Sequence, residues 1–245
     1  MGQSFWKSRL TRLWTTGLDL VFPIACLGCG KEGSLACRHC LSLIPEPDSQ
    51  VCPECKAPFS PSGATCTRCR SQTALDGLFV ARIYRFRFLQ NLIYALKYQF
   101  LQKTIPALVW LLQESLAHHP LPLPDLIIPV PLHSRRLRWR GFNQAELLAQ
   151  ELQKNLAPGL VIPLDTTSLK RIRLTQPQMK TDTREERLQN LMGAFLVRPE
   201  IAGPLVGKYV WLIDDVATTG TTLNECARAL KLAGVKKVWG IVIAR

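Results

Sequence analysis

The sequence lacks any uninterrupted apolar stretch that approaches the roughly 20 residues needed to cross a bilayer as a helix. It also lacks a convincing secretion signal. Lys7, Arg9 and Arg12 precede apolar residues near the N-terminus, but Asp19 interrupts the apolar part and no small-residue cleavage site follows. We therefore expect a cytoplasmic protein that is not an integral membrane protein.

Acidic residues are scarce. The 245 residues include 31 Lys and Arg but only 18 Asp and Glu, which gives a formal net charge of +13. Such an excess favours polyanionic partners: nucleic acid, an anionic membrane surface or a phosphorylated substrate. A basic surface without any such partner is the alternative.

Apolar residues recur at helical spacing near the N-terminus, which predicts an amphipathic helix over residues 1–24 that is stopped by Pro23. The apolar positions are Trp6, Leu10, Leu13, Trp14, Leu18 and Val21. We expect this face to pack on the protein itself or on a protein partner. Attachment to a membrane surface is the alternative.

Eight of the nine cysteines form four Cys-x-x-Cys pairs. Each pair presents two thiolates to one tetrahedral ion, so the pattern predicts two structural zinc sites in a module over residues 25–75. A disulfide framework is the alternative, but nothing else indicates secretion. The Pro45–Pro47 break favours consecutive sites over interleaved pairs, and Cys226 is expected in the core. The predicted ligands are Cys26, Cys29, Cys37 and Cys40, then Cys52, Cys55, Cys66 and Cys69.

Strand and helix patterns alternate from Leu78 onward, which predicts an α/β domain over residues 76–245. Its expected architecture is a doubly wound parallel sheet with helices on both faces, preceded by the zinc module. Ligands of such sheets bind at the carboxyl ends of the strands. The predicted strands are 80–86, 126–130, 210–213 and 238–244, and the predicted helices are 89–100, 105–116, 143–156 and 183–190.

A buried strand at 210–213 leads into two adjacent carboxylates, Asp214 and Asp215, where we expect the strand to end. A loop of small residues and a helix follow, and such a turn directs N–H groups at an anion. Carboxylates accept hydrogen bonds from neighbouring hydroxyls, so the whole stretch fits a ribose 5-phosphate. An ordinary βα turn is the alternative, but two carboxylates beside an anion site repel without a ligand or cation. The predicted phosphate-binding residues are Ala217, Thr218, Thr219, Gly220, Thr221 and Thr222.

Two basic segments could complete the site. Arginine guanidinium groups bind phosphate oxygens in pairs, so the arginine-rich loop after the strand at 126–130 suits pyrophosphate. A solvated loop or an RNA-binding patch is the alternative there. The segment 170–178 is a candidate lid, with a plain surface connection as the alternative. The candidate residues are Pro131, His133, Arg135, Arg136 and Arg140 in the loop, and Arg171, Arg173 and Gln178 in the lid.

The order of these motifs resembles the ComF family of phosphoribosyltransferase-like proteins. After the cysteine pairs come Leu-Lys-Tyr around Lys97, Pro-Val-Pro-Leu-His at 129–133, Arg-Gly-Phe-Asn-Gln at 140–144 and Thr-Gln-Pro-Gln at 175–178. Asp-Asp-Val-Ala-Thr-Thr-Gly at 214–220 resembles the phosphoribosyl diphosphate signature of type I phosphoribosyltransferases. The lid departs from the pattern, because residues 179–183 lack the expected Gly-Leu-Ser.

The resemblance implies a type I phosphoribosyltransferase fold that binds 5-phosphoribosyl 1-diphosphate with magnesium. It implies one of two functions. The first is transfer of the phosphoribosyl group to an unknown acceptor. The second is a DNA-handling accessory role in natural transformation, with single-stranded DNA as partner. Thr218 stands where enzymes that salvage 6-oxopurines carry an acidic residue, which argues against that acceptor class.

Overall fold

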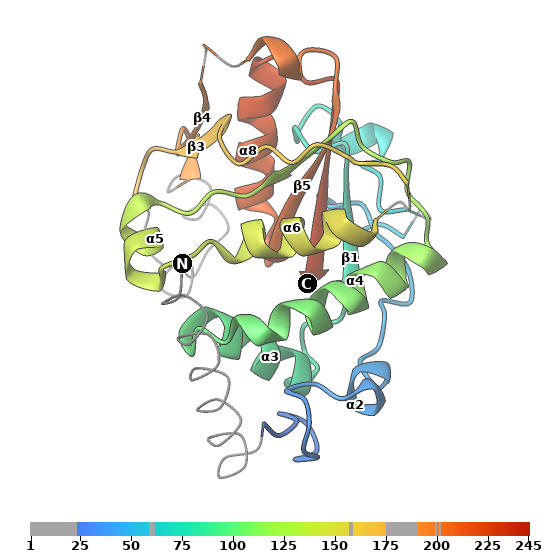
Figure 1. The fold of residues 1–245 in the computed structure, drawn as a ribbon. Coiled ribbons are helices and arrows are strands. Elements are labelled where there is room, and N and C mark those ends of the chain that lie inside the picture. The colour runs from blue at the N-terminus through green and yellow to red at the C-terminus, as the bar shows by residue number, and fades with distance from the viewer. Residues whose placement is uncertain (1–23, 59–61, 157–158, 175–190, 199, 201) are drawn as a thin grey trace, which may run out of the picture.

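The computed structural model describes residues 24–245, except 59–61, 157–158, 175–190, 199 and 201. Its centre is a sheet of four parallel strands in the order β1-β6-β5-β2 (Figure 1). Parallel strands need crossover connections, which the intervening helices provide. The bounds are β1 Gly77–Arg82, β2 Leu126–Pro129, β5 Tyr209–Val216 and β6 Lys237–Ala244.

Helices cover both faces of this sheet, so each face has its own apolar core. On one face α4 and α6 cross the strands, as Figure 1 shows, and α3 contributes to the same core. On the other face α8 packs against the sheet and against the antiparallel pair β3–β4. The bounds are α3 Arg87–Tyr98, α4 Ile105–His118, α6 Gln144–Asn155, α8 Thr221–Leu232, β3 Leu169–Arg171 and β4 Phe195–Val197.

The strand sequences explain this layering. Strands with helices on both sides are apolar along their whole length, and β6 buries every residue from Val238 to Ala244. In β5, Trp211 and Ile213 enter the core beneath α4 and α6, whereas Val210 and Leu212 face α8. The predicted parallel α/β sheet with helices on both faces is therefore confirmed.

The cysteine-rich segment closes the free edge of the sheet at β1. Leu78 N donates to Gly63 O at 2.9 Å, and Thr65 N donates to Asp76 O at 2.8 Å. Gly63 has φ +82, and a Cβ atom there would lie 2.1 Å from Leu78 O, so only glycine allows this approach. Gln50 continues the edge, because its side chain bonds both N and O of Val80. Edge strands expose unpaired backbone groups, and this module pairs them.

Two local predictions were wrong. The strand predicted at 80–86 is β1 at Gly77–Arg82, and Phe86 already caps α3. The predicted arginine loop contains a helix, α5 (Ser134–Arg140), since His133 caps its start and Gly141 ends it with φ +80. Arginine is a good helix former, which outweighs the charge repulsion. The short elements are α2 Arg38–Ser42, η1 Thr67–Cys69, η2 Gln102–Thr104 and η5 Gly203–Leu205.

The predicted N-terminal amphipathic helix, the helix predicted at 183–190 and the lid residue Gln178 lie outside the described residues. Within the described part of the chain, no helix is both long enough and apolar enough to cross a membrane.

Candidate functional site

The predicted phosphate loop lies between β5 and α8. Gly220 adopts φ +80 as the N-cap of α8, which turns the chain from the strand into the helix. The first N–H groups of a helix have no partner within it, and they carry partial positive charge. The Thr219 and Thr221 hydroxyl oxygens lie 2.8 Å apart beside this turn. The loop therefore offers N–H and hydroxyl donors to an anion. The pocket is lined by Asp214, Val216, Ala217, Thr218, Thr219, Gly220, Thr221, Thr222 and Leu223.

The two carboxylates point to opposite faces of the sheet. The prediction that the strand ends at them was wrong, because β5 continues to Val216, and neighbouring side chains of a strand alternate. Asp214 lines the pocket of the phosphate loop. Asp215 is buried on the other face, where its Oδ2 lies 2.5 Å from Nζ of Lys97. One carboxylate therefore faces the ligand pocket, while the other holds a lysine from α3.

The electrostatics of Asp214 favour a ligand. Burial and the adjacent Asp215 carboxylate raise the pKa of Asp214 to about 8, although Lys97 lowers it in part. An ionised Asp214 thus gains from any group that brings a cation or hydroxyl donors into the pocket. Perturbed carboxylates of this kind gather at functional sites.

Two of the predicted arginines, Arg140 and Arg171, lie near the acidic pair, and Arg136 lies near both of these arginines. Arg140, at the end of α5, bonds Gln144 Oε1 at 2.5 Å and lies near both carboxylates. Burial lowers the pKa of Arg140, and Asp215 partly offsets this effect. Burial and the nearby Arg136 lower the pKa of Arg171 on β3, and Asp214 partly offsets this. Guanidinium groups from α5 and β3 therefore lie beside the pocket, where they could hold phosphate oxygens.

The other predicted residues lie further out or have structural contacts. His133 Nδ1 accepts from Arg135 N at 3.2 Å, so this ring caps α5. The Arg135 side chain is exposed and Pro131 is half-buried. Arg173 donates to Met192 O at 2.9 Å and thereby ties the end of β3 to the chain before β4.

Three residues with positioning contacts were not among the predicted site residues: Lys97, Asn143 and Gln144. Asn143 donates to Val130 O at 3.1 Å and accepts from Ala145 N at 3.2 Å, so it fixes α6 to the end of β2. Gln144 orients Arg140. All three belong to the motifs that carry the family resemblance. Nothing else in the sequence indicated that they lie at the site.

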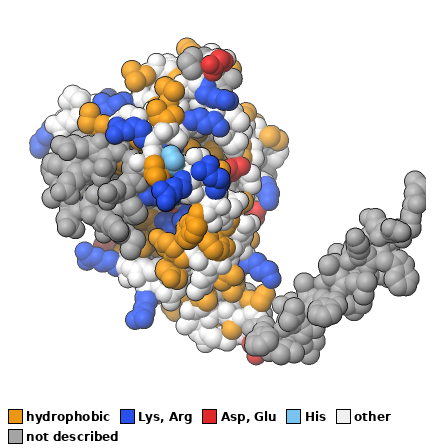
Figure 2. All heavy atoms as spheres, turned by 90° about the vertical axis from the view of Figure 1, so that its left-hand side faces the viewer, with side chains coloured by type: hydrophobic (Ala, Val, Ile, Leu, Met, Phe, Trp, Pro, Cys, Tyr) orange, Lys and Arg blue, Asp and Glu red, His pale blue; other side chains and the backbone are white. Residues whose placement is uncertain are grey.

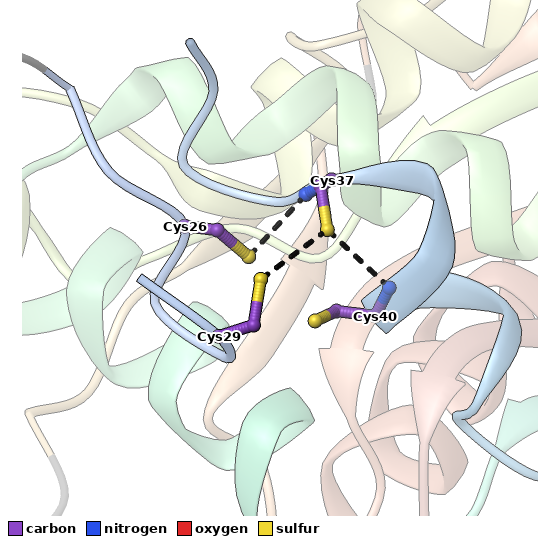
Figure 3. Close-up of side chains that lie close together, drawn as sticks. All are labelled: Cys26, Cys29, Cys37 and Cys40. Carbon is purple, nitrogen blue, oxygen red and sulfur yellow. Dashed lines mark hydrogen bonds between the residues drawn. The ribbon is translucent and has the colours of Figure 1, made fainter. Parts of the chain in front are cut away.

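Both predicted zinc sites are assembled, with consecutive pairing. In each group the four ligand atoms lie within 4.8 Å of one another. The sulfurs of Cys29 and Cys37 are 3.7 Å apart, and so are those of Cys55 and Cys66. Four sulfurs at tetrahedral corners about 2.3 Å from one zinc ion lie about 3.8 Å apart. Figure 3 shows the first group, whose sulfurs point toward a common centre. The ligands are Cys26, Cys29, Cys37 and Cys40, and Cys52, Cys55, Cys66 and Cys69.

Backbone N–H groups favour the thiolate form of the first ligand in each site. Burial raises the pKa of Cys26, but the N–H groups of Cys37, Cys29 and Gly28 outweigh it and lower the pKa to about 6. Backbone N–H groups likewise outweigh burial at Cys52 and lower its pKa to about 7. Zinc binds thiolates, so Cys26 and Cys52 favour the form that the metal requires. Cys226 lies on α8 and is fully buried in the core, as predicted.

Comparison with known proteins identifies the family. Residues 17–70 match the model of the double zinc ribbon domain. Competence protein F of Haemophilus influenzae is 33% identical over 233 residues, which cover 91% of this chain and 98% of that protein. The chain belongs to the ComF family. DNA utilization protein YhgH of Escherichia coli K12, another relative, is 34% identical over 82% of this chain and 86% of its own length.

Among solved structures, the glutamine phosphoribosylpyrophosphate amidotransferase of B. subtilis, complexed with ADP and GMP, matches this ComF-family chain. The match has a TM-score of 0.37 and 19% identity, and it covers 57% of this chain and 26% of the other. The likeness is too weak to say anything about function.

Proposed function

We propose that this protein binds 5-phosphoribosyl 1-diphosphate with Mg²⁺ at the carboxyl end of β5. The observation that carries the proposal is the pocket shared by Asp214 and the Thr-Gly loop. The loop at 217–222 would hold the 5-phosphate, and Asp214 would accept from the ribose hydroxyls. Arg136 and Arg140 would hold the pyrophosphate. Each assignment matches a donor or acceptor to a group of opposite character.

The residues also suit the metal. Mg²⁺ prefers substrate phosphates together with one or two carboxylates. Asp214 supplies a carboxylate beside the proposed phosphate positions, and its raised pKa favours a cation. When bound, the ion would neutralise charge on the pyrophosphate. Lys97 holds Asp215 and thereby fixes the end of β5.

The proposed reaction is transfer of the phosphoribosyl group to an acceptor that remains to be identified. Displacement of pyrophosphate gives the anomeric carbon oxocarbenium character, and the Asp214 carboxylate would stabilise that positive charge. The arginines bind the departing pyrophosphate. No protein nucleophile is required, because positioning and charge complementarity suffice.

Isothermal titration with phosphoribosyl diphosphate and Mg²⁺ tests the binding site. We expect wild type and the exposed control Asp48→Asn to bind, and Asp214→Asn to lose most of the affinity. If the wild type does not bind, the proposal fails. Pyrophosphate release with candidate acceptors then separates an enzyme from a protein that only binds the sugar phosphate.

The second candidate function is handling of DNA. Its support is the names of the relatives, competence protein F and DNA utilization protein YhgH, together with the net charge of +13. Fluorescence anisotropy with a labelled single-stranded oligonucleotide tests it. We expect binding that weakens steeply as salt rises, because phosphate contacts release counterions.

A further inference from the structure

A group of aromatic side chains is exposed where the chain leaves α3 and along α5. The exposed fractions are 55% for Tyr94, 43% for Tyr98, 42% for Phe100 and 61% for Trp139. Exposed rings that gather on one surface indicate a binding site more often than single ones do. Figure 2 views the side of the molecule that carries α5, and an apolar patch lies there beside clustered Lys and Arg side chains.

The rings are ordered against one another. Tyr94 and Tyr98 lie 5.0 Å apart, measured between ring centroids. Phe100 lies 5.5 Å from Trp139 and 6.3 Å from Phe142, both edge to face. Phe100 also has φ +57, a conformation that non-glycine residues rarely adopt and that often marks functional positions. With this backbone conformation the Phe100 ring packs against Trp139 and stays partly exposed.

The charge around the rings has one sign. Segments 87–113 and 126–145 carry the aromatic group, and neither contains an Asp or Glu. Together they contain Arg87, Lys97, Lys103 and the four arginines of α5. Arg135 and Arg138 are exposed, and the Arg140 guanidinium lies 5.9 Å from the centre of the Trp139 ring. A partner complementary to this surface would be anionic and would offer flat apolar faces.

We propose that this aromatic–arginine surface, formed by Tyr94, Tyr98, Phe100, Trp139, Arg135 and Arg138, binds single-stranded nucleic acid. Unpaired bases would stack on the rings, and backbone phosphates would contact Arg135 and Arg138. Single-strand-binding proteins combine these two features, stacking platforms and a basic track. The inference rests on the second proposed function, DNA handling, and it places the contact on the α/β domain instead of the zinc ribbons.

The test measures affinity for a fluorescein-labelled oligothymidylate by anisotropy. Trp139→Ala is expected to weaken binding about 5- to 150-fold, the loss of one stacked base. Phe100→Asn removes the other central ring and keeps the backbone conformation, since asparagine tolerates positive φ. It should weaken binding similarly. Arg138→Ala should reduce the salt dependence, lowering the slope of log affinity against log salt by about 0.7.

Two controls separate stacking from general damage. Trp139→Phe keeps a ring and is expected to retain most of the affinity. Leu232→Ala removes an apolar side chain that is 85% exposed on α8, and it should bind as wild type does. A duplex competitor should displace the oligothymidylate poorly, because paired bases cannot stack on protein rings.

The outcomes distinguish this site from the functions proposed above. If wild type binds and both Trp139→Ala and Phe100→Asn bind equally well, the site is wrong while DNA handling stands. If wild type binds no oligonucleotide, both the proposed surface and the DNA-handling function are wrong. Titration with phosphoribosyl diphosphate still tests the first proposed function independently. Phosphatidylglycerol vesicles that bind wild type but not Trp139→Ala, without oligonucleotide binding, would assign the surface to membranes and overturn the proposal.

Discussion

Lys97 on α3 and Asp215 on β5 form an ion pair with 2.5 Å between Nζ and Oδ2. The Asp215 side chain is only 3% exposed, and the lysine is 22% exposed. Burial lowers the pKa of Lys97, but Asp215 outweighs that effect and raises it. The pair joins α3, which carries Tyr94 and Tyr98 of the aromatic–arginine surface, to the strand that carries the acidic pair, and so links the two proposed sites.

Replacing Lys97 with methionine, which has similar length and no charge, leaves Asp215 buried without its cation. Breaking a buried pair from one side is costly, so we expect the free energy of unfolding at pH 7 to fall by about 3 kcal/mol. Urea denaturation measures the change. Lys103→Met is the matched control, because Lys103 is an exposed lysine that follows α3 in the sequence.

The double variant Lys97→Met/Asp215→Asn removes both charges and should recover part of the lost stability. If Lys97→Met and Lys103→Met unfold at the same urea concentration, the ion pair contributes nothing to the free energy of unfolding, and its stabilising role is wrong.

The Lys97–Asp215 pair shows what could not be predicted from the sequence. Strand, acidic pair, small-residue loop and helix were predictable, because each is a local pattern of polarity and turn chemistry. The zinc ligands were predictable from the Cys-x-x-Cys spacing, and their consecutive pairing from the break at Pro45–Pro47. The ion pair was not, since the two residues lie far apart in the sequence and nothing in the helical pattern around Lys97 marks a partner.

The errors have similar causes. Arg82 is buried at the end of β1, because Glu46 and Glu114 pair with it and Ser115 bonds it. A strand that ends in a buried arginine cannot be located from its apolar residues alone, because arginine is polar. The arginines of α5 suggested a loop, although helix caps flank them on both sides.

Gln50 replaces a neighbouring strand by pairing with both backbone groups of Val80. Gln50→Leu keeps the volume and leaves a buried N–H and C=O unpaired. Each such group costs about 1–3 kcal/mol, so we expect a loss of about 2–6 kcal/mol in unfolding free energy. Gln72→Leu, at an exposed position, should change little. If the two variants have the same free energy of unfolding, Gln50 does not stabilise the edge of the sheet.

Zinc in the second site should protect the edge strand, whereas zinc in the first should not. Cys29→Ser and Cys55→Ser each remove one exposed ligand, and each should lower the zinc content from two ions to one. Loss of the second site should speed hydrogen exchange at the amides of Leu78 and Thr65, which bond across the edge. Mass spectrometry of labelled peptides measures this. Identical exchange in both variants would show that the ribbon and the edge are uncoupled.

Glu46, between the two zinc ribbons, gives the protein a predictable response to acid. Burial raises the pKa of Glu46, but hydrogen bonds from Ser115 and His118 and the charge of Arg82 outweigh it, so the pKa lies below its ordinary value of 4.5. A lowered folded-state pKa means that the stabilisation is present above pH 4.5 and lost as pH falls further.

The difference in unfolding free energy between wild type and Glu46→Gln measures this contribution alone, since both proteins carry the same zinc sites. We expect a difference at pH 7 that narrows steadily as the pH falls below about 4.5. A difference that stays constant down to about pH 3 would mean that Glu46 has the same pKa in the folded and unfolded chain, and that its contacts with Arg82 and Ser115 do not favour the ionised form.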